Sequence, residues 1–274
     1  MAFTSRRAMH WLLALGGIPL VLYLLALGWL WARQERLLFQ PDPWPGADPP
    51  ALTEPDVRNV WVEVEGARLH ALHLQRPGAR GLVFFLHGNG GNLASWFVNT
   101  EFYRHAGYDL FMLDYRGYGR SSGQISSEAQ LMGDVRAAFA QVAPLYQGRP
   151  VVVYGRSLGS GLAAQLATEV HPALTVLVSP YRSMVALAGE QYPFVPTVLL
   201  RYPLRTDLAV GQIRGPLWLV HGERDTLIPP AHSEALQGTA GPRARLLRLP
   251  EAGHNDIHES PVYLDGLRAA LSSL

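Results

Sequence analysis

A strand-to-helix turn is encoded by the stretch Tyr154-Gly155-Arg156-Ser157-Leu158-Gly159-Ser160-Gly161. A short β-branched run, 151–153, precedes this stretch, and a helical pattern of small residues over 162–170 follows it. A G-x-S-x-G sequence in this context is typical of a nucleophile elbow, in which a sharp turn exposes the serine hydroxyl. The two flanking glycines fit such a turn because they lack a Cβ atom. The stretch therefore predicts that Ser157 is a nucleophile; the alternative is a glycine-rich turn that happens to contain a serine.

Apolar runs recur along the chain in the manner of a mainly parallel sheet. Continuous runs, typical of strands buried on both faces, lie at 82–86, 110–113, 151–154, 174–178, 217–220 and 245–249. The alternating segment 57–64 and the run 69–74 flank Glu65-Gly66 and predict an antiparallel hairpin. Helical patterns at 129–142 and 262–271 complete a succession of strands and helices that indicates an α/β fold.

Polar motifs follow the last two runs. In parallel sheets, functional residues lie at the carboxyl ends of the strands. Asp225 follows the run 217–220 and His254 follows the run 245–249. Serine becomes nucleophilic near neutral pH only with a base beside it, and imidazole has a suitable pKa. We therefore expect His254 to activate Ser157 and Asp225 to orient His254. The order Ser, Asp, His is the one that α/β hydrolases use.

The oxyanion of an acyl-transfer reaction needs two N–H donors. The amide of Leu158 lies at a helix N-terminus, where unpaired N–H groups favour negative charge. The second donor is expected from the glycine-rich loop 87–92, and we assign it to the amide of Asn89.

The remaining polar residues have simpler interpretations. We expect His87 and His221 to brace loops and His258 to lie at the surface or behind the site. Asp114 and Arg116 lie in a turn-rich loop, 114–122. The chain has no cysteine and no H-E-x-x-H motif, which argues against a metal site. The net charge of +1 gives no reason to expect nucleic acid as a partner, and no cofactor is implied.

The N-terminus predicts a membrane anchor. Residues 8–32 carry no Asp, Glu, Lys or Arg and are numerous enough to cross a bilayer. Trp11, Trp29 and Trp31 lie near the ends of this run, as interfacial aromatics do. A cleaved signal peptide and a twin-arginine signal at Ser5-Arg6-Arg7 are the alternatives. The terminal amine weakly favours a single-pass protein whose catalytic domain is on the non-cytoplasmic side, in a bacterial inner membrane. The bacterial source is inferred from the use of Arg without any Lys.

These patterns divide the chain into a tail at 1–7, the anchor at 8–32, a proline-rich linker at 33–55 and a catalytic domain at 56–274. Taken together, the motifs at 87–92, 114–122, 155–161, 179–180, 221–229 and 253–256 resemble those of the membrane-anchored, short-lid branch of the α/β-hydrolase superfamily. That branch includes lysophospholipases and protein depalmitoylases, and its domain is similar to serine aminopeptidases. The resemblance implies an eight-stranded sheet and a serine hydrolase that needs no cofactor, with Ser157, Asp225 and His254 as the triad and Asn89 and Leu158 as oxyanion donors.

The insert at 181–215 is apolar and is expected to be a lid or an acyl-binding wall. Its candidate substrate contacts are Met184, Leu187, Phe194, Val198 and Leu199. Arg182, Arg201 and Arg205 are weaker candidates for contacts with a charged head group. The sequence thus predicts hydrolysis of small acyl esters or thioesters, including lipids. A peptidase-like amide hydrolase and a non-catalytic binding module on the same fold are the alternatives.

Overall fold

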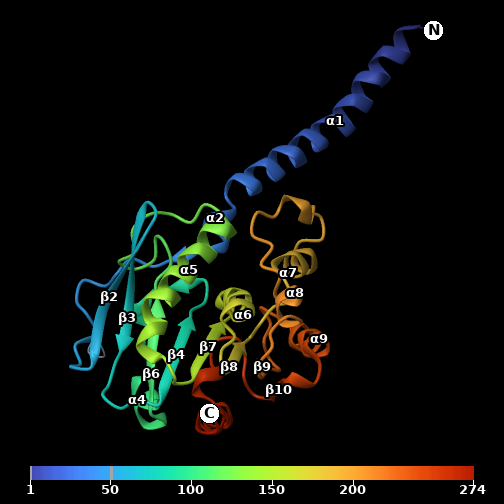
Figure 1. The fold of residues 1–274 in the computed structure, drawn as a ribbon. Coiled ribbons are helices and arrows are strands. Elements are labelled where there is room, and N and C mark those ends of the chain that lie inside the picture. Colours follow the sequence, from blue (N-terminus) through green and yellow to red (C-terminus); the bar gives the residue numbers. More distant parts are fainter. Residues whose placement is uncertain (1, 50–51) are drawn as a thin grey trace.

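One eight-stranded sheet forms the centre of the molecule (Figure 1). The computed structural model describes residues 2–49 and 52–274, with side chains from residue 17 onward. The strands follow the order β10-β9-β8-β7-β4-β6-β3-β2. Their bounds are β2 (Val57–Val64), β3 (Ala67–Leu74), β4 (Gly81–Leu86), β6 (Tyr108–Leu113), β7 (Val151–Arg156), β8 (Leu174–Val178), β9 (Leu217–Gly222) and β10 (Ala244–Leu249). Strand β3 is antiparallel to both of its neighbours and the other pairs are parallel, which confirms the predicted sheet and hairpin.

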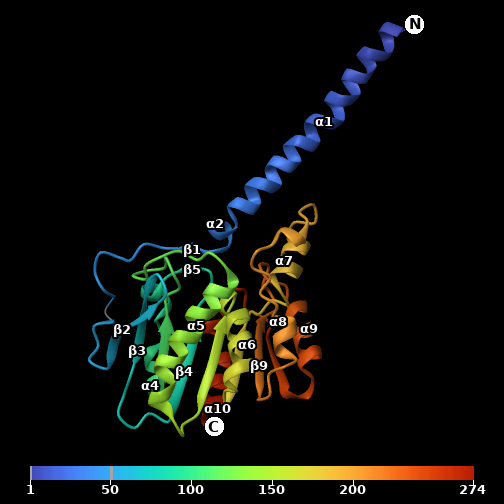
Figure 2. The same ribbon diagram turned by 45° about the horizontal axis from the view of Figure 1, so that its top comes forward.

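Helices cover both faces of this sheet (Figure 2). The core on one face contains α5 (Glu128–Val142), α6 (Leu158–Val170), α8 (Thr206–Val210) and α9 (Ala231–Ala240). The core on the other face contains α3 (Leu93–Trp96), α4 (Thr100–Ala106) and α10 (Pro261–Ser272). All six residues of β4 and of β6 are buried, as expected for strands that are covered on both sides.

The predicted helices α5 and α10 begin at serine caps. The side chain of Ser127 accepts a hydrogen bond from the amide of Gln130, and Ser260 precedes a proline at the first helical position of α10. Helices α3, α4 and α9 were not predicted. Helices α3 and α4 are short, with four and seven residues, and α3 begins at the Asn92 cap.

The segment expected as a linker lies against the catalytic domain. Its strand β1 (Gln40–Pro41) pairs in parallel with β5 (Gly90–Gly91), which belongs to the glycine-rich loop after β4. Phe39, just before β1, is buried and packs edge-on against Tyr202 of the insert. The proline-rich segment is therefore docked along part of its length.

The N-terminal helix α1 (Ala2–Ala32) projects away from the domain (Figures 1 and 2). A turn at Arg33 separates it from the short helix α2 (Gln34–Leu38). Within the described residues, no helix has the length and apolar character to cross a membrane. The anchor predicted at 8–32 is therefore not confirmed; side chains 8–16 of that span lie outside the description.

The insert between β8 and β9 forms short helices. They are α7 (Met184–Gln191), the 3-10 turn η3 (Thr197–Leu199) and α8. The insert contacts the N-terminal helices directly: the Tyr23 hydroxyl donates a hydrogen bond of 2.6 Å to the Phe194 carbonyl oxygen. The chain segments that approach the end of β7 are thus the insert, the N-terminal helices and the glycine-rich loop.

Candidate active site

Ser157 lies in the sharp turn where the chain leaves β7 and enters α6. Its φ of 52° and ψ of −122° are outside the regions that L-residues favour. The turn requires its glycines, because a Cβ atom on Gly155 would collide with the Gly159 carbonyl oxygen, and one on Gly159 would collide with the carbonyl oxygen of Leu86. The Ser157 amide donates to the Val178 carbonyl oxygen at 2.9 Å, which ties the turn to β8. The predicted elbow geometry is therefore present.

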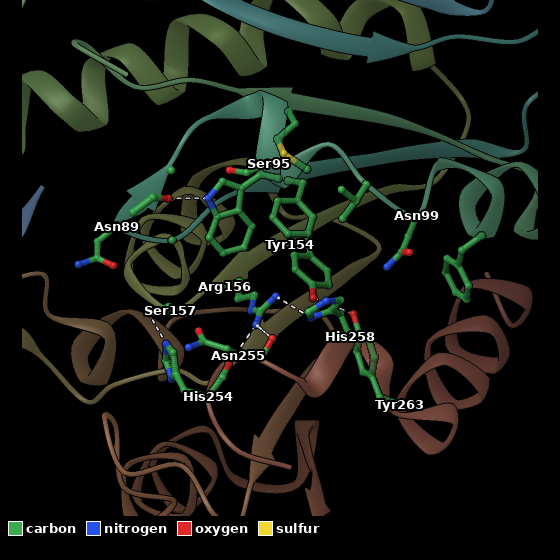
Figure 3. A pocket seen from close by; sticks show the side chains of 18 of the residues that line it. Asn89, Ser95, Asn99, Tyr154, Arg156, Ser157, His254, Asn255, His258 and Tyr263 are labelled. Atoms are coloured by element: carbon green, nitrogen blue, oxygen red, sulfur yellow. Dashed lines mark hydrogen bonds between the residues drawn. The ribbon is translucent and has the colours of Figure 1, made fainter. Parts of the chain in front are cut away.

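The imidazole of His254 connects Ser157 to Asp225, and Figure 3 shows its contact with Ser157. Its Nε2 atom is 3.0 Å from Ser157 Oγ, and its Nδ1 atom is 2.7 Å from Asp225 Oδ2. The three residues follow the ends of β7, β9 and β10 and meet at one edge of the sheet. In the neutral tautomer with a proton on Nδ1, His254 donates to the carboxylate and can accept the serine proton at Nε2.

Buried hydrogen bonds fix the carboxylate of Asp225. Its Oδ1 atom accepts from the amides of Leu227 at 3.0 Å and Ile228 at 2.8 Å. The ring of His221 contacts Asp225 Oδ2 at 3.3 Å and the Ile228 carbonyl oxygen at 2.8 Å. Burial alone would raise the pKa of Asp225, but the hydrogen bonds from His221, His254 and the Ile228 amide outweigh it and lower the pKa below its usual value. Asp225 is therefore ionised across the neutral range, and His221 braces its loop as predicted.

The two expected oxyanion donors flank the serine. Leu158 is the first residue of α6, and Asn89 precedes β5 in the glycine-rich loop. The Asn89 carbonyl oxygen accepts from the Gln40 amide at 2.9 Å and from the Tyr118 hydroxyl at 2.6 Å, so the docked N-terminal segment holds the peptide that follows Asn89. In the part of the chain that the structure describes, neither the Asn89 nor the Leu158 amide donates to a protein acceptor. Both amides are therefore available to an anion.

An apolar cavity of about 580 Å³ opens onto Ser157 between the insert and the N-terminal helices. Of the predicted substrate contacts, Met184, Leu187 and Leu199 lie in its wall. The opposing wall, which the sequence did not predict, is formed by side chains of α1 and α2, among them Leu30, Trp31, Gln34 and Leu37. The N-terminal segment is thus part of the site.

The structure does not bring Phe194 and Val198 to this cavity. Their side chains are 84% and 87% exposed, and neither belongs to the wall. Apolar character could not separate inward from outward positions here, because the only regular element between α7 and α8 among the described residues is the three-residue turn η3, which is too short to show a period.

A second cavity, of about 610 Å³, opens onto Ser157 and His254 (Figure 3). Arg156, Trp96 and His258 line it; the sequence analysis gave no role to Arg156 or Trp96 and placed His258 at the surface or behind the site. Arg156 directly precedes Ser157 in the elbow motif. A charged residue at this position was the one feature of the sequence that could have indicated a role in the site. The arginines proposed for a charged head group lie elsewhere, since neither cavity wall includes Arg182, Arg201 or Arg205.

Other polar residues brace the surrounding loops, as expected. Asp114 accepts from the Leu93 amide at 3.0 Å, and Arg116 forms a buried ion pair with Asp134 at 2.6 Å. Asp256 accepts from the amide three residues before it and makes no contact with the imidazole of His254. The assignment of the carboxylate to Asp225 agrees with this geometry.

Comparisons with known proteins agree with the fold. Residues 77–201 match the family model described as "Serine aminopeptidase, S33". An uncharacterised protein of Mycobacterium tuberculosis is 30% identical over 253 residues, which cover 89% of each chain. The human alpha/beta hydrolase domain-containing protein 17B is 29% identical over 201 residues, covering 72% of this chain and 68% of that one. An esterase of Pyrococcus furiosus shares the fold with a TM-score of 0.67 at 19% identity, over 86% of this chain and 96% of that one. The chain therefore belongs to the α/β-hydrolase family.

Proposed function

We propose that this protein is a serine hydrolase that cleaves acyl esters or thioesters through an acyl-enzyme on Ser157. The observation that carries the proposal is the continuous chain of contacts from Ser157 Oγ through His254 to Asp225, at 3.0 and 2.7 Å, where two cavities meet. Fold alone would not support this conclusion, because unrelated functions share the α/β-hydrolase fold.

The reaction follows from the atoms present. Ser157 Oγ attacks the carbonyl carbon while its proton passes to His254 Nε2. The amides of Asn89 and Leu158 donate to the oxyanion of the tetrahedral intermediate. The bond to the leaving oxygen or sulfur then breaks, and His254 returns the proton to that atom. Water adds to the acyl-enzyme with His254 as the base, which releases the carboxylic acid and regenerates Ser157.

The apolar cavity supports an acyl substrate. Leu187 of α7 and Trp31 of α1 contribute apolar surface on its two sides, and each CH₂ group buried there is worth about 0.8 kcal/mol. An uncharged chain of short to medium length fits such a wall better than a peptide, whose backbone N–H and C=O groups need partners.

We also propose that α1 attaches the protein to a membrane, which brings lipid substrates close to the site. In the described half of the helix, Leu22, Leu25, Trp29 and Trp31 are between 50% and 64% exposed, and apolar side chains of this size favour a lipid environment. The single-pass arrangement with an exported domain stays a prediction. A reporter fused after Leu274 tests it, because alkaline phosphatase requires export and green fluorescence indicates a cytoplasmic C-terminus.

A series of p-nitrophenyl esters from acetate to palmitate, with an aminopeptidase substrate beside it, tests the reaction. We expect turnover of the esters and labelling of the protein by a fluorophosphonate. Ser157→Ala should abolish both while the circular dichroism spectrum is unchanged. Ser126→Ala, which changes an exposed serine, is the matched control and should behave as the native protein.

Each alternative gives a different result. Turnover of the amide with none of the esters would indicate a peptidase-like enzyme. No turnover and no labelling of the native protein would indicate a non-catalytic binding module. Undiminished labelling of the Ser157→Ala variant would mean that the nucleophile is another residue.

A further inference from the structure

Arg156 is a buried cation beside the nucleophile. It is the last residue of β7, its exposed fraction is 8%, and it lies in the wall of the 610 Å³ cavity with Ser157 and His254 (Figure 3). An arginine in this position is exceptional, because charged side chains are rarely buried without an opposite charge.

The partners of Arg156 are all uncharged groups. Its Nη2 atom donates to the carbonyl oxygens of His254 and Asn255, each at 3.0 Å. Its Nη1 atom lies 3.4 Å from Nδ1 of His258, and the guanidinium carbon lies 5.2 Å from the centroid of the Trp96 ring. Among the ion pairs of the described residues, none includes Arg156.

Arg116 offers an internal comparison. It is buried to a similar degree, with 6% exposed, and it pairs with the carboxylate of Asp134 at 2.6 Å. The fold therefore pairs the buried Arg116 with a carboxylate, whereas the buried Arg156 faces a cavity and has no carboxylate partner among the described residues. A guanidinium that lines a cavity can bind carboxylate or phosphate groups through charge-assisted, often bidentate hydrogen bonds.

The position of His254 identifies which part of the substrate enters this cavity. The two cavities share Ser157 but His254 lines only the one that contains Arg156. In acyl transfer the imidazole gives its proton to the leaving group, so the leaving group must lie on the His254 side. The apolar cavity on the other side is left for the acyl chain.

We propose that the Arg156 cavity binds the leaving group of the substrate, and that this leaving group carries a carboxylate or a phosphate. The inference rests on the proposed ester hydrolysis and narrows it to acyl esters or thioesters with an anionic alcohol or thiol part. The general base and the bond that breaks are unchanged; Arg156 adds affinity for the departing half.

Matched substrates test the proposal. All three substrates are butyryl esters. The leaving group of the first is 4-hydroxybenzoate, which carries a carboxylate, and that of the second is its uncharged methyl ester. The third substrate, 4-butyryloxyphenyl phosphate, has a leaving group that carries a phosphate. The measured quantity is the ratio of kcat/KM for an anionic ester to kcat/KM for the neutral one. Comparing this ratio between native protein and variant cancels the intrinsic reactivities of the esters.

We expect Arg156→Gln to lower the ratio by about tenfold to a hundredfold, mainly through KM, because a hydrogen bond to a charged group is lost. Arg156→Lys should keep most of the kcat/KM ratio for the phosphate ester and less of the ratio for the carboxylate ester, since Lys preserves the charge but not the planar guanidinium. Arg182→Gln removes an exposed cation that lines neither cavity and should leave the ratio unchanged.

An equal fall for all three esters would overturn the proposal, because it would mean that Arg156 only positions the His254 loop. If the Gln variant does not fold, product inhibition of the native protein decides. The anionic product 4-hydroxybenzoate should inhibit neutral-ester hydrolysis at least about tenfold more strongly than its methyl ester, and equal inhibition would overturn the proposal. Failure of the native protein to hydrolyse even the neutral ester would instead contradict the proposed function.

Discussion

Gln34 donates a hydrogen bond of 2.7 Å from its side-chain nitrogen to the carbonyl oxygen of Leu199, although 165 positions separate the two residues. The side-chain oxygen of the same Gln34 accepts from the amide of Arg201 at 2.9 Å. The carboxamide of Gln34 thus bridges α2 to the insert at the end of the 3-10 turn η3. Because both segments form walls of the apolar cavity, the shape of that cavity depends on this bridge.

Removing the bridge should loosen the insert. Gln34→Ala deletes both hydrogen bonds, each worth about 1 kcal/mol, and we expect amide hydrogens over 184–200 to exchange about tenfold faster or more. Gln34→Glu keeps the acceptor and loses the donor, so its effect should be intermediate. Gln124→Ala, at an exposed loop position, is the control. Exchange rates equal to those of the native protein would show that the insert holds its position without α2.

Filling the apolar cavity should shorten the preferred acyl chain. Leu187 lies in the cavity wall, and Leu187→Trp adds volume where a longer chain would lie. We expect kcat/KM for the octanoate ester to fall at least about tenfold, because each excluded CH₂ group forfeits about 0.8 kcal/mol, while the acetate ester stays within about twofold. Val198→Trp makes the same kind of change at a position that is 87% exposed and should have no effect. A parallel loss for both esters would remove the cavity from acyl recognition.

The elbow makes a sharp prediction about glycine. A Cβ atom on Gly159 would collide with backbone oxygens of Leu86 and His87, so Gly159→Ala should lower the free energy of unfolding by about 1–3 kcal/mol and reduce activity. In helix α5, by contrast, Gly133 has open space around its Cα atom. Gly133→Ala should raise the free energy of unfolding by about 0.5–1 kcal/mol, because alanine favours a helix interior. Urea unfolding measures both, and similar effects for the two variants would contradict the close packing of the elbow.

The sequence was most informative where a pattern is local. Strands such as β4 and β6 are buried on both faces, so their burial is visible as continuous apolar runs. The elbow is equally local, because its strained serine and its glycines are neighbours in the chain. Ser157, Asp225 and His254 could be grouped because each follows a strand of one parallel sheet, and such ends meet at one edge.

The missed features depend on contacts between distant segments. No period in the sequence reports that α2 lies against Leu199, or that the Gln40 amide binds the Asn89 carbonyl oxygen. Arg156 was passed over because the motif leaves its position unspecified, and only the structure shows that no carboxylate faces it. Phe194 was expected at the cavity because it is apolar, but it is exposed beside α1.

Stability should decrease as the pH falls from neutral to about 4, because two histidines are buried in an uncharged form. Burial, with a smaller effect of a nearby arginine, lowers the pKa of His70 and of His73 to about 4. In the unfolded chain these groups take up protons near pH 6.5. Between pH 6.5 and 4 the unfolded state therefore binds more protons, and unfolding becomes easier with each step down. At pH 4 each histidine should have lowered the free energy of unfolding by about 3 kcal/mol relative to neutral pH.

Urea unfolding at pH 7, 5.5 and 4 measures this slope. His73 Nε2 lies 2.7 Å from the Tyr146 hydroxyl, and His73→Gln offers an amide in its place that does not titrate. The free energy of unfolding of this variant should decrease less between pH 7 and 4 than that of the native protein. The change His70→Gln should reduce the decrease further. His105→Gln removes an imidazole that is 77% exposed and should keep the native slope. Stability that is unchanged between pH 7 and 5.5 and falls only below about pH 5 would assign the acid sensitivity to carboxylates instead, because carboxylates paired in the folded state lose their contribution between about pH 5 and 1.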